Sequence, residues 1–215
     1  MEQACLVTGK SSELLAEVVH EVVARDRKVL LARSGPLEIP VEGEAIATVS
    51  CNRRSALSAR SIVLQAQNLY GRLEEAVIVF SPVRESVPFH ESSIVSIENR
   101  TDAEVKGYLF LIRELVALFQ KQRRGRLAIA VHTAETEVRS PLEAMSLGSF
   151  TAAAEALHSY YRNEALDVRL CRSTSDDLTG FAGFVAETLH APAGRRARTE
   201  WVRFGARGGL FGRGR

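Results

Sequence analysis

The chain lacks several features that would point to secretion, metal binding or a membrane. Its three cysteines, Cys5, Cys51 and Cys171, are an odd number, and no two of them have metal-ligand or redox spacing. No apolar run approaches the length of a membrane span. The start at Met1–Gln3 lacks the basic flank of a signal peptide. We therefore expect a cytoplasmic protein with reduced, buried thiols and no metal site.

A strong charge of either sign is also missing. The formal net charge is +2, with 25% charged and 46% hydrophobic residues, which is ordinary for a globular protein. No overall field favours nucleic acid or a membrane surface. At 215 residues the chain can bury a substantial core. We expect one domain over residues 1–209 and a Gly/Arg-rich tail over 210–215.

The opening turn is poor in glycine. Residues 5–15 predict a buried strand, a phosphate-type turn and the start of a helix. The turn has Gly9, but Glu13 and Leu15 stand where a nucleotide-binding loop has two further glycines. Such a loop needs its second glycine so that pyrophosphate can approach the backbone. Glu13 would place a carboxylate there, which favours a nucleotide-binding fold kept as a scaffold after loss of its chemistry.

Apolar runs and helical periodicity alternate along the whole chain. Ser11 or Ser12 is available to cap the first helix, and Thr101 the longest one. This alternation requires right-handed crossovers between parallel strands. It predicts an α/β fold, a Rossmann-like doubly wound parallel sheet of about seven strands with helices on both faces. The expected strands are 4–7, 28–32, 45–49, 76–80, 127–131, 167–171 and 201–204, and the expected helices are 11–25, 55–69, 102–123, 149–162 and 177–189.

Two further segments have a clear sequence pattern: the helix expected over 55–69 and the connection before the third strand. The helix has Leu57, Ile62, Leu64 and Leu69 at helical spacing. Residues 34–43 are rich in Gly and Pro and predict a long connection.

Six segments, in order, resemble the short-chain dehydrogenase/reductase family across essentially the whole chain. Thr8-Gly9-Lys10-Ser11-Ser12 resembles the family's Thr-Gly-x-Ser-Ser turn. Arg33, at the end of the second strand, is where an arginine often meets an NADP phosphate. The other matching segments are Leu69–Glu74 leading into 76–79, Lys106–Phe110, Arg124–Leu127 and Thr151–Leu157.

The resemblance implies NADP or NAD as the cofactor, if the chain binds any. It places Thr8, Gly9, Ser11, Ser12 and Arg33 at the cofactor. Glu13 opposes tight binding, because a carboxylate beside the phosphates is repelled by them and also occupies the positive end of the helix dipole. We expect no bound cofactor.

The catalytic residues that the resemblance implies are absent. The family's tyrosine position falls on Leu147, its lysine on Thr151 and its asparagine on Glu104. Its serine falls on Val131 or His132, and the turn beside the adenosine reads Phe80–Val83. No Tyr-x-x-x-Lys follows residue 127, no lysine follows Lys121, and Tyr160 and Tyr161 lie about two and a half helical turns beyond Thr151. His132 remains open as a functional or a structural histidine.

Assembly is the property that the resemblance leaves in place. The alanine-rich helix with Ala152, Ala153, Ala154 and Ala156, together with the 102–123 helix, corresponds to the family's four-helix-bundle dimer surface. We expect a homo-oligomer, dimer or tetramer, although ordinary packing on the sheet explains the alanines equally well. Residues 172–177 replace the family's long substrate-binding loop, which removes a lid.

Three functions remain open from the sequence. The first is a non-catalytic protein, a pseudoenzyme, acting as an oligomeric scaffold or regulatory partner. The second is a divergent NAD(P)(H)-dependent oxidoreductase. The third is a nucleic-acid-binding adaptor, because seven C-terminal arginines face the single acid Glu200. These arginines are Arg195, Arg196, Arg198, Arg203, Arg207, Arg213 and Arg215.

Overall fold

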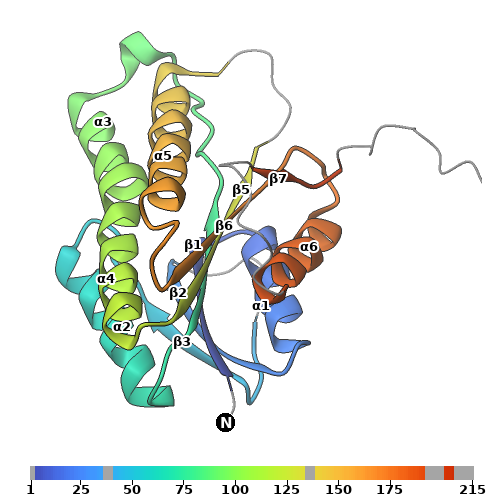
Figure 1. Ribbon diagram of the computed structural model, residues 1–215. Coiled ribbons are helices and arrows are strands. Elements are labelled where there is room, and N and C mark those ends of the chain that lie inside the picture. Colours follow the sequence, from blue (N-terminus) through green and yellow to red (C-terminus); the bar gives the residue numbers. More distant parts are fainter. Residues whose placement is uncertain (1–2, 36–40, 134–138, 192–200, 206–215) are drawn as a thin grey trace, which may run out of the picture.

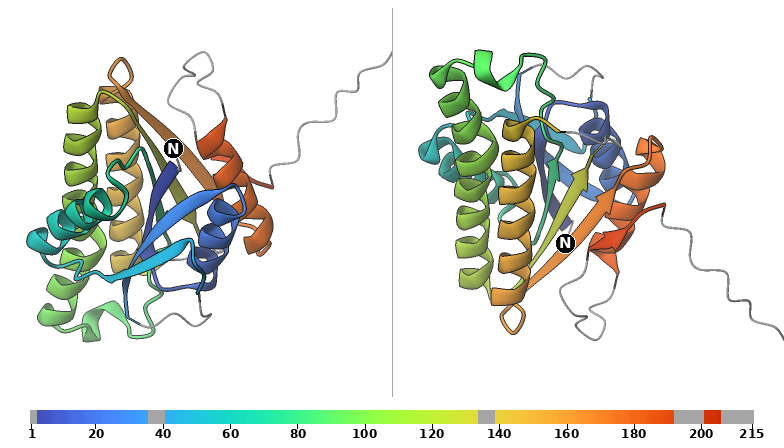
Figure 2. Two further views of the ribbon diagram at one scale, coloured as in Figure 1. Left: turned by 90° about the horizontal axis from the view of Figure 1, so that it is seen from below. Right: turned by 90° about the horizontal axis from the view of Figure 1, so that it is seen from above.

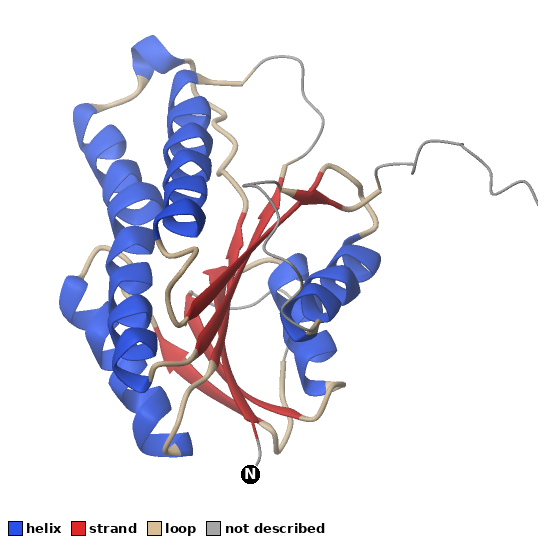
Figure 3. Ribbon diagram, viewed as in Figure 1, coloured by secondary structure: helices blue, strands red, loops and turns tan. Residues whose placement is uncertain are grey.

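Seven parallel strands form one sheet in the order β3-β2-β1-β4-β5-β6-β7 (Figures 1 and 3). The computed structural model describes residues 3–35, 41–133, 139–191 and 201–205. Every expected strand is present, and the α/β prediction with about seven strands is confirmed. The strands are β1 (Gln3–Lys10), β2 (Arg27–Ser34), β3 (Ile46–Ser50), β4 (Glu75–Phe80), β5 (Gly125–His132), β6 (Leu166–Ser173) and β7 (Val202–Arg203).

Helices cover both faces of the sheet (Figure 2). Helices α1 (Glu13–Val23) and α6 (Leu178–His190) lie side by side on one face. Helices α2 (Ala56–Tyr70), α4 (Gly107–Gln122) and α5 (Pro141–Tyr160) lie on the other, with α3 (Ile94–Thr101) continuing α4 beyond the sheet. The prediction of a doubly wound sheet is therefore confirmed.

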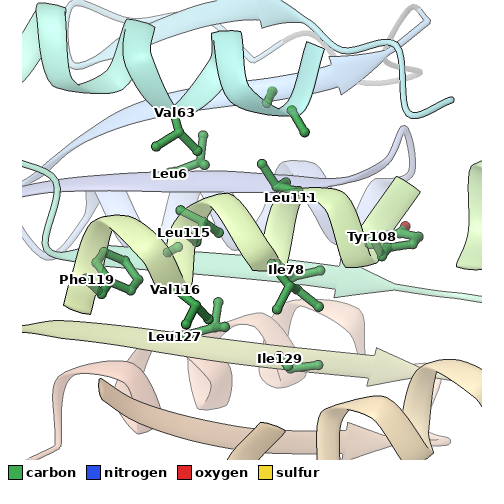
Figure 4. Packing of buried hydrophobic residues seen from close by; sticks show 14 of the residues in the cluster. Leu6, Val63, Ile78, Tyr108, Leu111, Leu115, Val116, Phe119, Leu127 and Ile129 are labelled. Atoms are coloured by element: carbon green, nitrogen blue, oxygen red, sulfur yellow. The ribbon is translucent and has the colours of Figure 1, made fainter. Parts of the chain in front are cut away.

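The core has two layers because the strands are apolar on both sides. All six residues of β4 are buried, as in a strand with helices on both faces. On the α4 side, Leu115 and Phe119 pack with Leu6, Ile78 and Leu127 (Figure 4). On the other side, residues of β1 and β4 such as Val7 and Val79 pack with α1 and α6. Burial of this apolar surface is the main stabilising term.

Helix caps decide where two of the helices begin and end. Ser12, rather than Ser11, caps α1, since its hydroxyl oxygen accepts a hydrogen bond from the Leu15 backbone N–H at 3.3 Å. Helix α2 ends at Gly71, whose φ of 72° lies in the region that favours glycine.

The longest helix begins earlier than the sequence predicts. Ser93 caps α3, and the helix runs through a π-helical turn at Asp102–Lys106 into α4 without interruption. The prediction that Thr101 is the N-cap is wrong: its hydroxyl donates to the Ile97 carbonyl inside the helix, at 2.8 Å. The sequence missed α3 because the first residues of this helix carry no buried face.

Two other helices also differ from the prediction. Helix α5 begins at Pro141 with Ser140 as its cap, so the predicted start at 149 is too late. In α2, Leu57, Leu64 and Leu69 are exposed, and only Ile62 of the four apolar residues faces the core. The small residues Ala59 and Ala66 lie on the buried face beside it, which allows α2 to approach the sheet closely.

A buried ion cluster lies at the amino edge of the sheet, opposite the turn after β1. Glu75 of β4 accepts hydrogen bonds from Arg27 at 2.9 Å and Arg126 at 3.3 Å, and its Oε2 lies 3.2 Å from Nε2 of His190. Burial alone would raise the pKa of Glu75. The hydrogen bonds from His190 and Arg27 outweigh that effect and hold the pKa below its ordinary value.

The three cysteines are buried free thiols, as predicted. Burial raises the pKa of each, that of Cys171 to about 12. Within the part of the chain that the structure describes, no helix has the length and hydropathy needed to cross a bilayer. Residues 36–40 of the predicted long connection, and most of the C-terminal arginines, lie outside the described residues.

Candidate nucleotide-binding crevice

The strand order places a crevice at the carboxyl ends of β1 and β4. The helix after β1 covers one face of the sheet and the helix after β4 covers the other, so the two connections diverge between these strands. In open α/β sheets ligands bind at such a switch point. The turn with Gly9, Ser11 and Ser12 lies directly there.

A hollow of about 220 Å³ opens beside this turn. Glu13 is exposed in the first turn of α1, so its carboxylate lies where the helix dipole attracts anions. The hollow is lined by Lys10, Ser11, Ser12, Glu13, Val79, Ser81 and Pro82.

The predicted cofactor residues are brought together, but their polar groups already have partners. Thr8 is buried, and its hydroxyl donates to the Ala32 carbonyl at 2.8 Å. Ser11 donates to the Ser34 carbonyl at 3.0 Å, and Ser12 caps the helix. Arg33 Nη1 donates to the Gly35 carbonyl. These contacts hold the turn in place, and a bound phosphate would have to compete with them.

Gly9 has a structural reason to be glycine. A Cβ at this position would lie 2.7 Å from the Val79 carbonyl oxygen and 3.2 Å from a methyl group of Leu15. The absent side chain lets α1 and β4 approach the end of β1. Gly9 thus performs the close-packing function of such a turn whether or not a nucleotide binds.

Arg53 and Tyr108 occupy the crevice between the ends of β1, β3 and β4. Arg53 follows β3, and its Nη1 donates to the Tyr108 hydroxyl oxygen at 2.7 Å. The hydroxyl in turn donates to the Val79 carbonyl at 3.4 Å. Burial raises the pKa of Tyr108, and the charge of Arg53 opposes that rise. Only about 10 Å³ of space remains beside this pair, room for a single water.

An aromatic cluster lies next to this pair, in the core between the end of β4 and helices α4 and α5. The rings of Phe80 and Phe150 stack with centroids 4.1 Å apart, and the edge of Tyr108 packs against both. All three side chains are buried. Phe80 begins the turn that, by resemblance, packs beside an adenosine, and Phe150 lies between the positions of the family's tyrosine and lysine. Apolar rings therefore occupy the space next to the expected reacting groups.

Glu104, at the position of the family's asparagine, is locked in an ion cluster. It lies in the π-helical turn and is 7% exposed. Its Oε2 accepts from Arg100 Nε at 3.3 Å, and Arg100 Nη1 donates to Glu85 at 2.5 Å. Arg100 Nη2 also donates to the Val83 carbonyl. The cluster ties the loop after β4 to the long helix and leaves Glu104 with a structural partner.

Of the remaining expected catalytic positions, only His132 carries a titratable side chain, and its ring contacts a backbone carbonyl. Leu147 packs against the core, and the Thr151 hydroxyl donates to the Leu147 carbonyl at 2.8 Å. Val131 is buried, and His132 Nε2 lies 3.0 Å from the carbonyl oxygen of Ser175, next to Phe181. Tyr160 is 80% exposed at the far end of α5, near the amino edge of the sheet.

Sequence reasoning missed Arg53, Tyr108 and Phe150 as a group. They come from the loop after β3, from α4 and from α5, so only the sheet topology brings them together. A pair of arginines at positions 53 and 54, three residues after the end of β3, was the available signal. Among the described residues, no three His, Cys, Asp or Glu side chains gather as a metal site would require.

Comparisons with known proteins support the fold. No family model matches the chain. An uncharacterised protein of Treponema pallidum (strain Nichols) is 28% identical over 165 residues, which is 75% of this chain and 74% of the relative.

Several solved structures superpose on most of the chain at low sequence identity. A metagenomic short-chain oxidoreductase in complex with NADP has a TM-score of 0.77 at 15% identity, over 94% of this chain and 97% of its own. A Serratia marcescens short-chain dehydrogenase/reductase has a TM-score of 0.74 at 14% identity, over 95% and 96%. A short-chain dehydrogenase of Leptospira borgpetersenii with bound NAD+ has a TM-score of 0.72 at 12% identity, over 88% and 86%. The chain has the fold of the short-chain dehydrogenases and reductases.

Proposed function

We propose that this chain is a non-catalytic protein, a pseudoenzyme, of the short-chain dehydrogenase/reductase fold, acting as an oligomeric scaffold or regulatory partner. One observation carries the proposal: buried side chains of the protein itself occupy the part of the crevice beyond the hollow at the turn after β1. The stacked rings of Phe80 and Phe150, with Tyr108 and Arg53 beside them, occupy the switch point where the fold binds ligands. A dinucleotide would have to displace buried aromatic surface and break the Arg53–Tyr108 hydrogen bond.

The side chains at the family's proton-transfer positions support the same function. General acid–base catalysis needs a titratable side chain within hydrogen-bond reach of the substrate. Leu147 is apolar, Thr151 donates back to its own helix and Glu104 is paired with Arg100. The one nearby phenol, Tyr108, is buried, and its pKa is raised rather than lowered.

The outer face of α5 supports assembly as the working property. Small residues recur every fourth position along its exposed side, at Ala144, Gly148, Ala152 and Ala156. Small side chains let a second helix approach closely, and α5 lies beside α4 on the same face of the sheet (Figure 1). We propose a homo-oligomer that buries this face.

A divergent oxidoreductase is the second candidate, since solved structures of this fold carry NADP or NAD. The hollow beside Ser11 and Ser12, with Arg33 at the end of β2, favours it, and NADP is the cofactor it would take. The third candidate, nucleic-acid binding through the basic tail, stays a prediction, since nearly all of that tail lies outside the described residues.

Titration with NADPH and NADH separates the first two functions. Thermal unfolding is followed at about 1 mM dinucleotide, where a Kd near 10 μM would add about 2.7 kcal/mol of stability. Energy transfer from Trp201, the one tryptophan in the chain, to the nicotinamide gives a second readout. We expect neither a rise in the melting temperature nor energy transfer. A saturable response with both readouts would contradict the scaffold function and support the oxidoreductase.

A further inference from the structure

Two arginines lie side by side at the carboxyl edge of the sheet, away from the crevice between β1 and β4. Arg172 of β6 and Arg203 of β7 are direct partners in the parallel ladder. Side chains alternate along a strand, so residues two apart share a face. Leu170 and Trp201, two residues earlier, both pack on the α4–α5 side. The two guanidinium groups therefore leave the sheet on that same side.

Neither guanidinium has an acidic partner in the part of the chain that the structure describes. Within the described ranges, no carboxylate lies within ion-pair distance of Arg172 or Arg203, and neither side chain makes a hydrogen bond. By contrast, Arg27 of β2 and Arg126 of β5, at the amino edge of the sheet, share the carboxylate of Glu75. Two like charges held in register without a counter-charge repel one another, so an anion between them is favourable.

The two arginines line a hollow of about 440 Å³, which has room for a small ligand. The loop from β6 to α6 supplies further donors to it. The Ser175 hydroxyl accepts a hydrogen bond from the Asp177 N–H at 3.1 Å, which leaves its own hydrogen without an acceptor among the described residues. Thr174 is exposed in the same loop. The hollow is lined by Arg172, Ser173, Thr174, Ser175, Asp176, Arg203, Phe204 and Gly205.

We propose that this hollow binds a phosphate group, with Arg172 and Arg203 as its principal ligands. Guanidinium groups bind phosphate oxygens in pairs, and hydroxyl donors complete the set that an acceptor-only ligand requires. Asp176 is the one acid on the rim, and its carboxylate weakens the site. The phosphate belongs either to a small phosphorylated molecule or to a nucleic-acid backbone. The site is independent of the proposed scaffold function and of the hollow beside Glu13.

Pyrophosphate titration of the full chain by isothermal calorimetry tests the site. We expect saturable binding that weakens about tenfold in Arg172→Gln and in Arg203→Gln, as for loss of one charged hydrogen-bonding partner. Asp176→Asn should strengthen it. Arg60→Gln is the matched control, because Arg60 is an exposed arginine of α2 and its loss changes the net charge equally. Circular dichroism confirms that each variant is folded.

Three results would overturn the proposal. One is the absence of binding in the wild type. Another is an equal loss of pyrophosphate affinity in Arg60→Gln, which would mean a general charge effect. The third is a loss of pyrophosphate affinity in Arg33→Gln without any loss in Arg172→Gln, which would place the anion in the hollow beside β1.

A second arm identifies the source of the phosphate. A ten-nucleotide single-stranded RNA is compared with pyrophosphate across a range of salt concentrations. Tighter binding of the RNA with a steep salt dependence assigns the phosphate to a nucleic acid, because several counterions are then released. Equal or weaker binding of the RNA assigns it to a small molecule. Both assignments require the loss in Arg172→Gln.

Discussion

Gly9 of β1 is the ladder partner of Val79 of β4, and a Cβ on Gly9 would lie 2.7 Å from the Val79 carbonyl oxygen. The close approach is between backbone atoms of two buried strands, so neither can move aside without disturbing the sheet. Gly9→Ala should therefore lower the free energy of unfolding by about 2–3 kcal/mol. Urea denaturation measures this. Gly183→Ala, inside α6, is the control: its Cβ would lie 3.5 Å from the nearest atom, a carboxylate oxygen of Glu21, and a helix-interior alanine should leave stability equal or slightly higher.

The Glu75 cluster predicts both a mutational cost and a pH dependence. Glu75→Gln leaves Arg27 and Arg126 without their carboxylate and should cost about 3 kcal/mol. Because the folded pKa of Glu75 is lowered, its contribution is complete above the ordinary glutamate pKa and is lost as pH falls through the folded pKa. Urea denaturation between neutral pH and about pH 3 should therefore show that the free energy of unfolding falls less steeply with acid in the variant than in the wild type. Glu74→Gln, whose arginine partners are about half exposed, should cost under about 1 kcal/mol.

Tyr108→Phe tests the contact that occupies the crevice. Removing the hydroxyl leaves the Arg53 guanidinium without its acceptor and should cost about 1–2 kcal/mol. The folded pKa of Tyr108 is raised, so its contribution is present below the ordinary tyrosine pKa of about 10 and is lost as pH rises above it. Stability of the wild type should fall more steeply than that of the variant in alkali. Tyr70→Phe, which removes a hydroxyl bonded only to the Val29 carbonyl, should cost less.

Glu13→Gln tests whether a single carboxylate opposes cofactor binding. If Glu13 repels phosphates at the start of α1, its neutralisation should bring out an energy-transfer signal with NADPH that the wild type lacks. Glu17→Gln removes the same charge one turn later on the same helix and should leave the signal absent. Energy transfer from Trp201 gives the measurement. Equal effects of the two variants would show that only net charge matters.

Ala152→Arg tests the proposed assembly. A long charged side chain on the exposed face of α5 should prevent close helix approach and give a monomer in sedimentation velocity. Gln65→Arg, on the exposed face of α2, adds the same charge and should leave the oligomer intact. A monomeric wild-type protein would contradict the proposal directly.

The sequence predicts the sheet better than the helix boundaries, for a physical reason. Strands buried on both faces are continuous apolar runs, and residues 76–80 form such a run. Helix α3 has no buried face of its own, so periodicity began only where α4 meets the sheet. In α2 the large residues Leu57 and Leu64 are exposed and the small Ala59 and Ala66 are buried, which reverses the usual hydrophobic pattern.

Part of the candidate site could likewise be predicted from the sequence and part could not. The turn at Gly9 was predictable, because its residues are contiguous and form a known strand–turn–helix pattern. The contacts of Arg53 with Tyr108, and of Phe80 with Phe150, join segments far apart in the chain. Which side chain enters a crevice depends on register and helix rotation, and local propensity specifies neither.

The strand order also constrains how the protein folds as it leaves the ribosome. The first strand of the chain, β1, becomes an interior strand, and one of its edges pairs with β2 as soon as Arg27–Ser34 has been made. Its other edge must wait for β4, so an apolar, unpaired strand edge persists until residues 75–79 emerge. After that, β5, β6 and β7 each add to the last strand formed, in the order of synthesis. The vulnerable interval for misassembly or chaperone capture therefore lies in translation of the first third of the chain.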